Sequence, residues 1–456
     1  MKSFHFVGVG GIGMSALAAG AAACGWQVTG SDRGADRPEN RAIIGALKNR
    51  GVRIFPQDGS RFAGPPPDAL VYSTAIEEDN PDFAAAGSLP RMHRSEFLRM
   101  LLEKFHRRSV AVTGSCGKSS VTAYLTETLE RIGADPVMIA GGLSKRFRSS
   151  DNAGNFRFGK GDALVFEADE SDKSLLAYGA DYAIILNIGT DHYDRAELAA
   201  VFGEFLRNIR RGAVLSHQVA EALAWKFPEN LEIRIFDGDD PRYRLAEYHP
   251  GLRPLAIFGD GTRVSLPAPG RHTALNALAI RALAAMLGAD DRAVTAALEH
   301  FDGVWRRSDF AGRTPGGAAV FDDYAHNPEK ILSCLSAMRE IAPGRLFAVF
   351  QPHGYKPFGF MEKQLFELLE KFLRADDRFI LLEPFYAGGT SSFSPHSADV
   401  CARWRAASAA PERFRFMEDR DEVRAFIRAS AGADDLAAVM GARDNSLSDF
   451  ARSLTL

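Results

Sequence analysis

A glycine-rich turn that carries a lysine and serines is the segment of this chain best suited to chemistry. It comprises Gly114, Ser115, Cys116, Gly117, Lys118, Ser119 and Ser120. An apolar run precedes it and a helical pattern follows, so backbone N–H groups and a helix N-terminus face the same point, where an anion binds. Lys118 can reach the β- and γ-phosphates of a nucleotide, and the Ser119 hydroxyl can hold Mg²⁺. Val112 stands where the full pattern has glycine, so the sequence predicts a shortened P-loop. Since Gly114, Gly117, Lys118 and Ser119 are all in place, we favour this interpretation over an ordinary strand-to-helix turn.

An acidic segment follows the next apolar run, 163–166. Glu167 is its first polar residue, and carboxylates that end a parallel strand lie where α/β proteins bind ligands. Mg²⁺ beside phosphates takes oxygen ligands, so Glu167 is the predicted metal ligand; a solvated acidic loop is the alternative. His192 comes just after the following strand-like run, 182–188, and is therefore expected at the same edge.

The N-terminus holds a second glycine turn. Gly8, Gly10 and Gly13 fit the G-x-G-x-x-G pattern after a strand-like run, and Asp32 ends the next one. This pattern predicts a diphosphate cradle with an acid near a ribose. NAD, FAD and a UDP-sugar all satisfy that geometry, and a tight packing turn is the alternative.

The last third of the chain offers weaker signals. Asp322, Asp323, Tyr324 and His326 follow a strand-like run and precede a helix start. The basic pair Arg306-Arg307 comes before them, and a basic pair at a domain boundary can clamp a γ-phosphate. His353 and Lys356 end a further strand-like run and are expected in the same cleft.

Strand-like runs alternate with helical patterns along all 456 residues, which predicts an α/β protein with parallel sheets and about three domains. The net charge of −3 predicts no general nucleic-acid binding. No apolar run is long enough to span a membrane and no signal-peptide pattern opens the chain. The four scattered cysteines show no metal spacing, so a cytoplasmic protein without structural disulfides is expected.

Taken together, these motifs resemble the ATP-dependent Mur ligases of peptidoglycan synthesis, and in particular their alanine-adding members. The segments that carry the resemblance are 5–15, 30–32, 73–76, 80–81, 167–172, 187–192, 270–272, Asn276, 303–307, 322–328 and 350–353. They keep the order of that family nearly end to end.

The resemblance implies a three-domain α/β fold. Residues 1–107 would form a Rossmann-like domain that binds the UDP-sugar, 108–307 a central P-loop ATPase domain with a parallel sheet, and 308–456 a Rossmann-like C-terminal domain. The reaction implied is ATP-dependent coupling of an amino acid, with L-alanine as first choice, to UDP-N-acetylmuramate through an acyl phosphate. ATP and Mg²⁺ would be required, and a monomer or weak homo-oligomer is expected.

The resemblance also implies roles for individual residues. The UDP-sugar would contact Gly8, Gly10, Gly11, Ile12, Gly13, Met14, Ser15, Ser31, Asp32, Ser73, Thr74 and Ala75. ATP would contact the turn 114–120 together with Asn276, Arg306, Asp323, Tyr324 and His326. The metal ligands would be Ser119, Glu167 and His192, and the catalytic residues Lys118, His192 and Arg306.

Several positions depart from the family pattern. The usual Thr-His after the first P-loop glycine is Ser115-Cys116, and the usual asparagine after Arg-His is Thr273. The usual His-Arg-Tyr near the amino-acid site has Gly354 in place of arginine, and Lys356 is a candidate to replace that charge. The segments 386–390 and 441–445 also differ, and 205–210 holds no lysine.

Two alternatives to this ligase remain open at this level. A Mur-type ligase with another amino acid or a peptide as acceptor, or an ATP-binding regulator without catalysis, would explain the C-terminal departures. A nicotinamide or flavin oxidoreductase would explain the first glycine turn alone, but the single P-loop and the acidic segment argue against it.

Overall fold

The computed structural model describes residues 1–171, 173–189, 194–386 and 393–456. The chain divides into two compact units. The first comprises Met1–Tyr248, Ala256–Pro267 and Ala274–Trp305, and the second His249–Leu255, Ala268–Thr273 and Arg306–Leu456.

The first unit begins with a parallel five-stranded sheet in the order β3-β2-β1-β4-β5. Its strands are β1 (Ser3–Val7), β2 (Gln27–Ser31), β3 (Arg53–Phe55), β4 (Ala69–Tyr72) and β5 (Arg91–His93). Its helices are α1 (Ile12–Ala23), α2 (Arg41–Asn49), α3 (Pro81–Ala86) and α4 (Arg94–Phe105). Small residues let α1 pack closely, since a Cβ on Gly20 would lie 3.0 Å from Leu101 of α4.

A seven-stranded sheet completes the core of the first unit, in the order β12-β11-β10-β6-β9-β7-β8. Its strands are β6 (Arg108–Thr113), β7 (Val137–Ile139), β8 (Phe156–Arg157), β9 (Ala163–Glu167), β10 (Ala180–Ile185), β11 (Ile209–Ser216) and β12 (Glu232–Phe236). Among the described pairings, only β7 with β8 is antiparallel. The ends of β7, β9, β6 and β10 therefore meet at one edge.

Helices and a small sheet accompany this seven-stranded sheet. The helices are α5 (Lys118–Arg131), α6 (Arg195–Arg207), α7 (His217–Ala222), α8 (Arg271–Met286) and α9 (Asp291–Leu298). The small sheet is β13 (Leu245–His249), β14 (Leu255–Phe258) and β15 (Arg263–Ser265).

The second unit holds a six-stranded sheet in the order β16-β17-β21-β18-β19-β20. Its strands are β16 (Asp309–Arg313), β17 (Ala319–Asp323), β18 (Leu346–Phe350), β19 (Arg378–Leu381), β20 (Phe414–Phe416) and β21 (Leu436–Met440). Its helices are α10 (Pro328–Arg339), α11 (Tyr355–Phe372), α12 (Ser397–Ala407), α13 (Arg420–Ser430) and α14 (Leu447–Ser453). All strand pairs are parallel except β16 with β17.

The chain reverses its direction of winding at β21, which lies between β17 and β18. Side chains of α10, α11 and α12 pack in one core cluster, whereas those of α13 and α14 pack in another. The loops that leave β17, β21 and β18 therefore diverge to opposite faces of the sheet. Such a divergence opens a crevice at the carboxyl edge, where ligands bind in doubly wound sheets.

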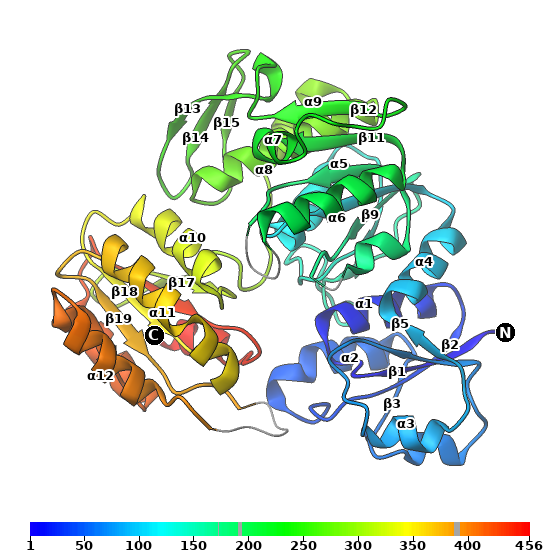
Figure 1. Cartoon of the computed structure of the whole chain (residues 1–456), viewed down its shortest axis with the longest axis horizontal. Helices are drawn as coiled ribbons and strands as arrows, with labels where there is room; N and C mark the ends of the chain where they lie inside the picture. The colour runs from blue at the N-terminus through cyan, green and yellow to red at the C-terminus, as the bar shows by residue number, and fades with distance from the viewer. Residues whose placement is uncertain (172, 190–193, 387–392) are drawn as a thin grey trace. The chain divides into compact units, whose positions relative to one another are not determined.

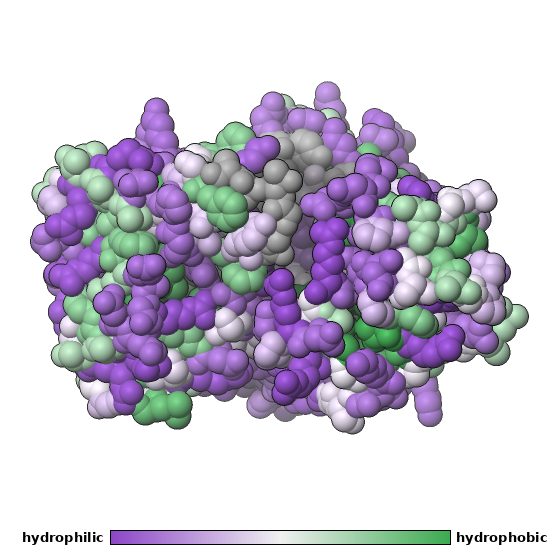
Figure 2. Space-filling model, turned by 90° about the horizontal axis from the view of Figure 1, so that it is seen from below, coloured by the Kyte–Doolittle hydropathy of each residue, from purple (hydrophilic) through white to green (hydrophobic). Residues whose placement is uncertain are grey.

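The visible surface in Figure 2 is mostly hydrophilic, with hydrophobic residues in patches between hydrophilic ones. No helix in the described part of the chain is both long and apolar enough to cross a membrane.

Candidate functional site

The P-loop turn forms at the carboxyl end of β6, and Lys118 begins α5 directly after it. Gly114 has a φ of +132° and Gly117 a φ of +89°, conformations that side chains rarely adopt. A Cβ on Gly114 would also lie 3.0 Å from the Cβ of Leu186. The two glycines therefore allow both the turn and its close approach to β10.

Asn187, just after β10, fixes the middle of this turn. Its side-chain amide donates to the Cys116 carbonyl at 2.9 Å, and its Oδ1 accepts from the Cys116 backbone N–H at 2.8 Å. The backbone N–H of Gly189 donates to the Ser115 hydroxyl at 2.8 Å. No role was predicted for Asn187, because only the pairing of β6 with β10 brings it to the turn.

Glu170 forms an ion pair with the P-loop lysine. The Nζ of Lys118 donates to both carboxylate oxygens of Glu170, at 2.7 and 2.9 Å, and to the Gly114 carbonyl at 3.0 Å. Burial lowers the pKa of Lys118, but the nearby carboxylates, Glu170 foremost, outweigh it and raise that pKa above its usual value. The lysine is therefore charged and already neutralised by a carboxylate, which a triphosphate would have to displace.

Ser119 and Glu167 both lie beside Gly141 and Gly142, the two glycines that follow β7. The backbone N–H of Gly141 donates to Glu167 at 2.8 Å, and a Cβ on Gly142 would lie 2.9 Å from the Cβ of Ser119. A hydroxyl and a carboxylate beside a phosphate-binding turn suit Mg²⁺, which keeps several waters and needs few protein ligands. The other predicted ligand, His192, lies outside the described residues, as does Asp172.

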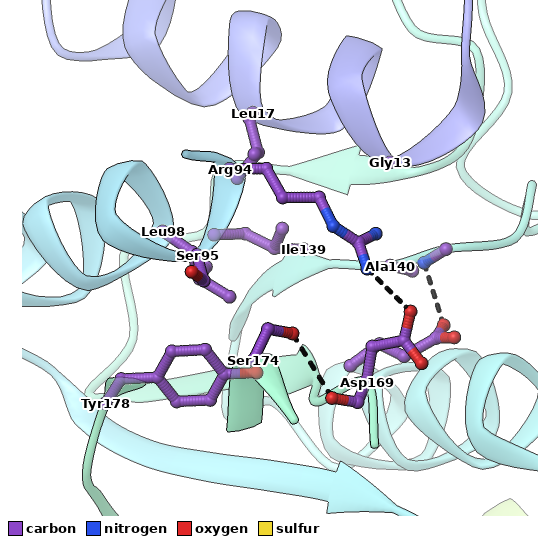
Figure 3. A pocket seen from close by; sticks show the side chains of 12 residues that line it. Gly13, Leu17, Arg94, Ser95, Leu98, Ile139, Ala140, Asp169, Ser174 and Tyr178 are labelled. Carbon is purple, nitrogen blue, oxygen red and sulfur yellow. Dashed lines mark hydrogen bonds and ion pairs between the residues drawn. The ribbon is translucent and has the colours of Figure 1, made fainter. Parts of the chain in front are cut away.

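A pocket connects the first glycine turn to these acidic residues (Figure 3). Gly13 of α1 and Arg94 of α4 line one side of it, and Glu167 and Asp169 line the other. Arg94 donates to Asp169 at 2.8 Å across the pocket. Burial raises the pKa of Asp169, but the charges of Lys118 and Arg94 hold it at about 2. Arg94 was not among the predicted site residues, because nothing in its local sequence indicates that α4 borders this pocket.

The first glycine turn is held by Asp32 itself. One carboxylate oxygen of Asp32 accepts from the Gly10 N–H at 2.9 Å, and the other accepts from the Gly34 N–H at 2.7 Å. A Cβ on Gly10 would lie 2.8 Å from that carboxylate. In this structure Asp32 therefore shapes the turn, and its contact with a ribose stays a prediction.

The other predicted UDP-sugar residues lie around the same sheet edge. Gly11 is the N-cap of α1, and Ile12, Gly13, Met14 and Ser15 form its first turn. Ser73, Thr74 and Ala75 follow β4, the neighbour of β1. Ser31 is different, because it is fully buried and its hydroxyl bonds to the buried Asp82.

The predicted ATP contacts divide between the two units. In the first unit, a Cβ on Gly117 would lie 3.8 Å from the side-chain oxygen of Asn276, so this asparagine borders the P-loop. In the second unit, Arg306 is completely buried, and its guanidinium donates to Asp322 and to the carbonyls of Gly441 and Asp444. With those acceptors engaged, any contact of Arg306 with a phosphate stays a prediction.

The remaining residues predicted around ATP lie at the crevice beside β21. Asp323 accepts from the backbone N–H groups of Ser308 and Ala325, at 2.7 and 2.8 Å. The rings of Tyr324 and His326 are 5.7 Å apart, and the rings of His326 and His353 are 5.1 Å apart. Tyr324, His326 and His353 therefore form a continuous aromatic wall at the ends of β17 and β18.

The fold and the turn at β6 define an α/β P-loop protein. Its first unit also contains the parallel five-stranded sheet, which is Rossmann-like. Profiles of the Mur ligase family match three successive segments: the catalytic domain over residues 3–106, the middle domain over 112–285 and the glutamate ligase domain over 306–443. The chain belongs to the Mur ligase family. This membership decides against the oxidoreductase interpretation of the first glycine turn.

Curated relatives cover nearly the whole chain. The UDP-N-acetylmuramate–L-alanine ligase of Chelativorans sp. (strain BNC1) is 32% identical over 96% of this chain and 94% of its own length. The protein of the same name from Agrobacterium fabrum is also 32% identical, over 96% and 93%.

Solved structures share the architecture. The UDP-N-acetylmuramate–alanine ligase of Thermotoga maritima superposes with a TM-score of 0.78 at 26% identity, covering 99% of this chain and 98% of its own. A murein peptide ligase of Psychrobacter arcticus superposes with a TM-score of 0.71 at 22% identity, covering 100% and 98%, and supports the fold alone.

Proposed function

We propose that this protein is an ATP-dependent amide ligase that joins an amino acid, L-alanine in the first place, to UDP-N-acetylmuramate in peptidoglycan precursor synthesis. The observation that carries the proposal is the nearly full-length similarity, at 32% identity, to proteins named UDP-N-acetylmuramate–L-alanine ligase. The P-loop geometry supports it, because the residues that such a reaction needs around a triphosphate lie at one sheet edge. Its site of action is the cytoplasm, where ATP and nucleotide-linked sugars are available.

The first step activates the carboxylate of the sugar's lactyl group. A carboxylate oxygen attacks the γ-phosphorus of ATP, the bond between that phosphorus and the bridging oxygen breaks, and ADP leaves. Lys118 stabilises the negative charge that spreads over the phosphoryl oxygens, and the backbone N–H groups of 114–119 hold the phosphates. Mg²⁺, held by Ser119 and Glu167, would supply further positive charge when bound.

The second step forms the amide. The amine attacks the acyl carbon, a tetrahedral intermediate forms, phosphate leaves with its bonding electrons, and the nitrogen loses a proton. The pocket between Gly13 and Glu167 lies between the proposed diphosphate cradle and the proposed ATP site. We assign the sugar's reacting end to this pocket, because a substrate held at the first turn must extend toward the γ-phosphate.

Mass spectrometry of the product tests this function. The purified protein is incubated with UDP-N-acetylmuramate, ATP, Mg²⁺ and a mixture of all amino acids, and ADP release is measured in parallel. We expect a product that is heavier than UDP-N-acetylmuramate by one alanine residue. One ADP should be released for each amide formed. A product with another amino acid would correct the acceptor, whereas ATP binding without amide formation from any amine would favour a non-catalytic regulator.

A further inference from the structure

The first turn of helix α1, at the proposed diphosphate cradle, is held by a residue far along the chain. The side-chain amide of Asn155 donates to the Ile12 carbonyl at 2.6 Å and to the Ser15 hydroxyl at 2.8 Å. The Ser15 hydroxyl donates in turn to the same Ile12 carbonyl at 3.0 Å. Asn155 and Ser15 are both almost completely buried, so water competes little for these hydrogen bonds. The start of α1 is therefore fixed to the segment that precedes β8.

The backbone of Asn155 is bound to the edge of the central sheet. Strands β7 and β8 pair antiparallel, and the chain next to them stays paired, because the Ala140 N–H donates to the Asn155 carbonyl at 2.8 Å. The next residue, Gly141, donates its N–H to Glu167, the proposed metal ligand, at 2.8 Å. Ala140, Gly141 and Glu167 all line the pocket drawn in Figure 3. Two consecutive residues therefore connect Asn155 to Glu167.

The loop between β7 and β8 is braced in itself and against α2. The Ser144 N–H donates to the Gly154 carbonyl at 2.8 Å, and a Cβ on Gly154, whose φ is +103°, would clash with the Ser144 carbonyl. Arg50, the C-cap of α2, donates to the Asp151 carbonyl at 3.1 Å. Its guanidinium lies over the Phe156 ring, with Cζ 5.3 Å from the centroid. A loop held at these points keeps its shape, so the place of Asn155 sets that of α1.

This connection bears on the reaction because the two substrates would be held by different helices. The proposed diphosphate cradle is at the start of α1, whereas the phosphates of ATP would face the start of α5. Reacting atoms must come within about 3–3.5 Å of each other, and a displacement of about 1 Å can lower the rate about 100-fold. Asn155 is not among the described residues that line the pocket between the two helices. Any effect of Asn155 on the reaction therefore passes through its neighbours α1 and Gly141.

We propose that Asn155 is a positioning residue that sets the distance between the sugar's lactyl carboxylate and the γ-phosphate of ATP. It holds the first turn of α1, through Ile12 and Ser15, at a fixed place relative to Glu167 and the P-loop. The proposal rests on the proposed function and deepens it, because it names the contact that brings the two substrates together. A purely structural Asn155 would instead affect the stability of the fold and leave the kinetics of the folded protein unchanged.

The variant Asn155→Ala removes both hydrogen bonds to α1 and separates these two roles. Asp32 still holds the glycine turn through the Gly10 N–H, so UDP-N-acetylmuramate and ATP, each measured alone by calorimetry, should keep their wild-type Kd. We expect kcat for amide formation, measured below the Tm of the variant, to fall about 10- to 100-fold, since the approach of the two substrates is lost. Asn155→Ser, whose shorter side chain cannot reach both acceptors, should show a smaller fall. It provides the same comparison if Asn155→Ala does not fold.

Asn49→Ala is the matched control. The amide of Asn49 donates to the Ser150 carbonyl of the same loop at 2.6 Å, but from α2 rather than α1, so this variant should keep the wild-type kcat. An unchanged kcat in folded Asn155→Ala overturns the proposal. So does an equal loss of kcat in Asn49→Ala, or a loss that a higher Kd for UDP-N-acetylmuramate explains completely. A wild type that couples no amine at all contradicts the proposed function itself, on which this role depends.

Discussion

The carboxyl edge of the central seven-stranded sheet and that of the C-terminal sheet present positive charge in opposite ways. At the first, Lys118 is buried and bonded to both oxygens of Glu170. At the second, Arg443 is exposed and no carboxylate partner is recorded for it among the described residues. A buried cation without a counter-ion would be costly, whereas an exposed one remains hydrated. The burial of the cation therefore decides what an incoming anion must displace. At a buried cation it displaces a carboxylate counter-ion, and at an exposed one it displaces only water.

The largest effect should come from the buried cation. Lys118→Ala removes the charge that faces the γ-phosphate, and we expect kcat/KM for amide formation to fall by about 1000-fold or more. ADP release coupled to product mass provides the measurement. Lys371→Ala, on α11 of the other unit, is the matched control. Substantial ligation by Lys118→Ala would place the triphosphate away from this turn.

Gly141→Ala should have the next largest effect. The new Cβ would lie 2.8 Å from the Glu167 oxygens, so the carboxylate must shift. We expect the Mg²⁺ concentration for half-maximal activity to rise about 10- to 100-fold, as for other changes next to a metal ligand. Gly64→Ala, where nothing lies within 4 Å of the new Cβ, should leave the Mg²⁺ requirement unchanged. An unaltered requirement in Gly141→Ala would argue against Glu167 as a ligand.

The variant Glu170→Gln tests the role of Glu170 as the counter-ion of Lys118. Without its charge, Lys118 is released and the repulsion between carboxylate and triphosphate disappears. We expect the Kd for ATP, measured by calorimetry without the other substrates, to fall about 3- to 10-fold, since more of the free protein is competent to bind. Weaker binding would instead show that Glu170 positions the lysine. Glu197→Gln, whose carboxylate pairs with Lys173 on the surface, is a suitable control.

The smallest effect concerns pH and the helix that carries Lys118. Burial raises the pKa of Glu127 on α5 to about 7. Because the folded-state pKa lies above the unfolded value, the contribution of Glu127 to stability is present at low pH and is lost as pH rises from about 4.5 through 7. Between pH 5 and pH 8, the Tm of the wild type should therefore fall relative to that of Glu127→Gln, by about 2–6 °C. A constant difference between the two proteins would contradict the raised pKa.

Local patterns predicted the elements well where a strand ends in a chemically distinctive turn. The strands that lead into Lys118, Glu167 and Asp323 lie where the apolar runs indicated, because a buried parallel strand needs a continuous apolar run. The boundaries moved by a few residues elsewhere: the predicted run was 182–188, whereas β10 begins at Ala180 and ends at Ile185. The pairing with β6 and β11 ends there, and a sequence does not show where its partners stop.

Residues that act through partners distant in sequence were not predicted. Glu170 and Arg94 meet Lys118 and Asp169 only because β9 lies next to β6 and α4 packs beside α1. Arg306 was expected to reach a phosphate, and that contact stays a prediction. In this structure its buried guanidinium bonds to Asp322 and to two carbonyls of the loop after β21. The sequence shows that an arginine is present but not which acceptors surround it.

By itself, the sequence determined the α/β class, the P-loop and the family, since each depends on residue types at short, fixed spacings. Only the tertiary structure decided which charges are neutralised inside the protein and which remain available to a ligand. Pairing of groups such as Lys118 with Glu170 depends on distances of about 3 Å between segments far apart in the chain, and those distances are set by strand order and helix packing.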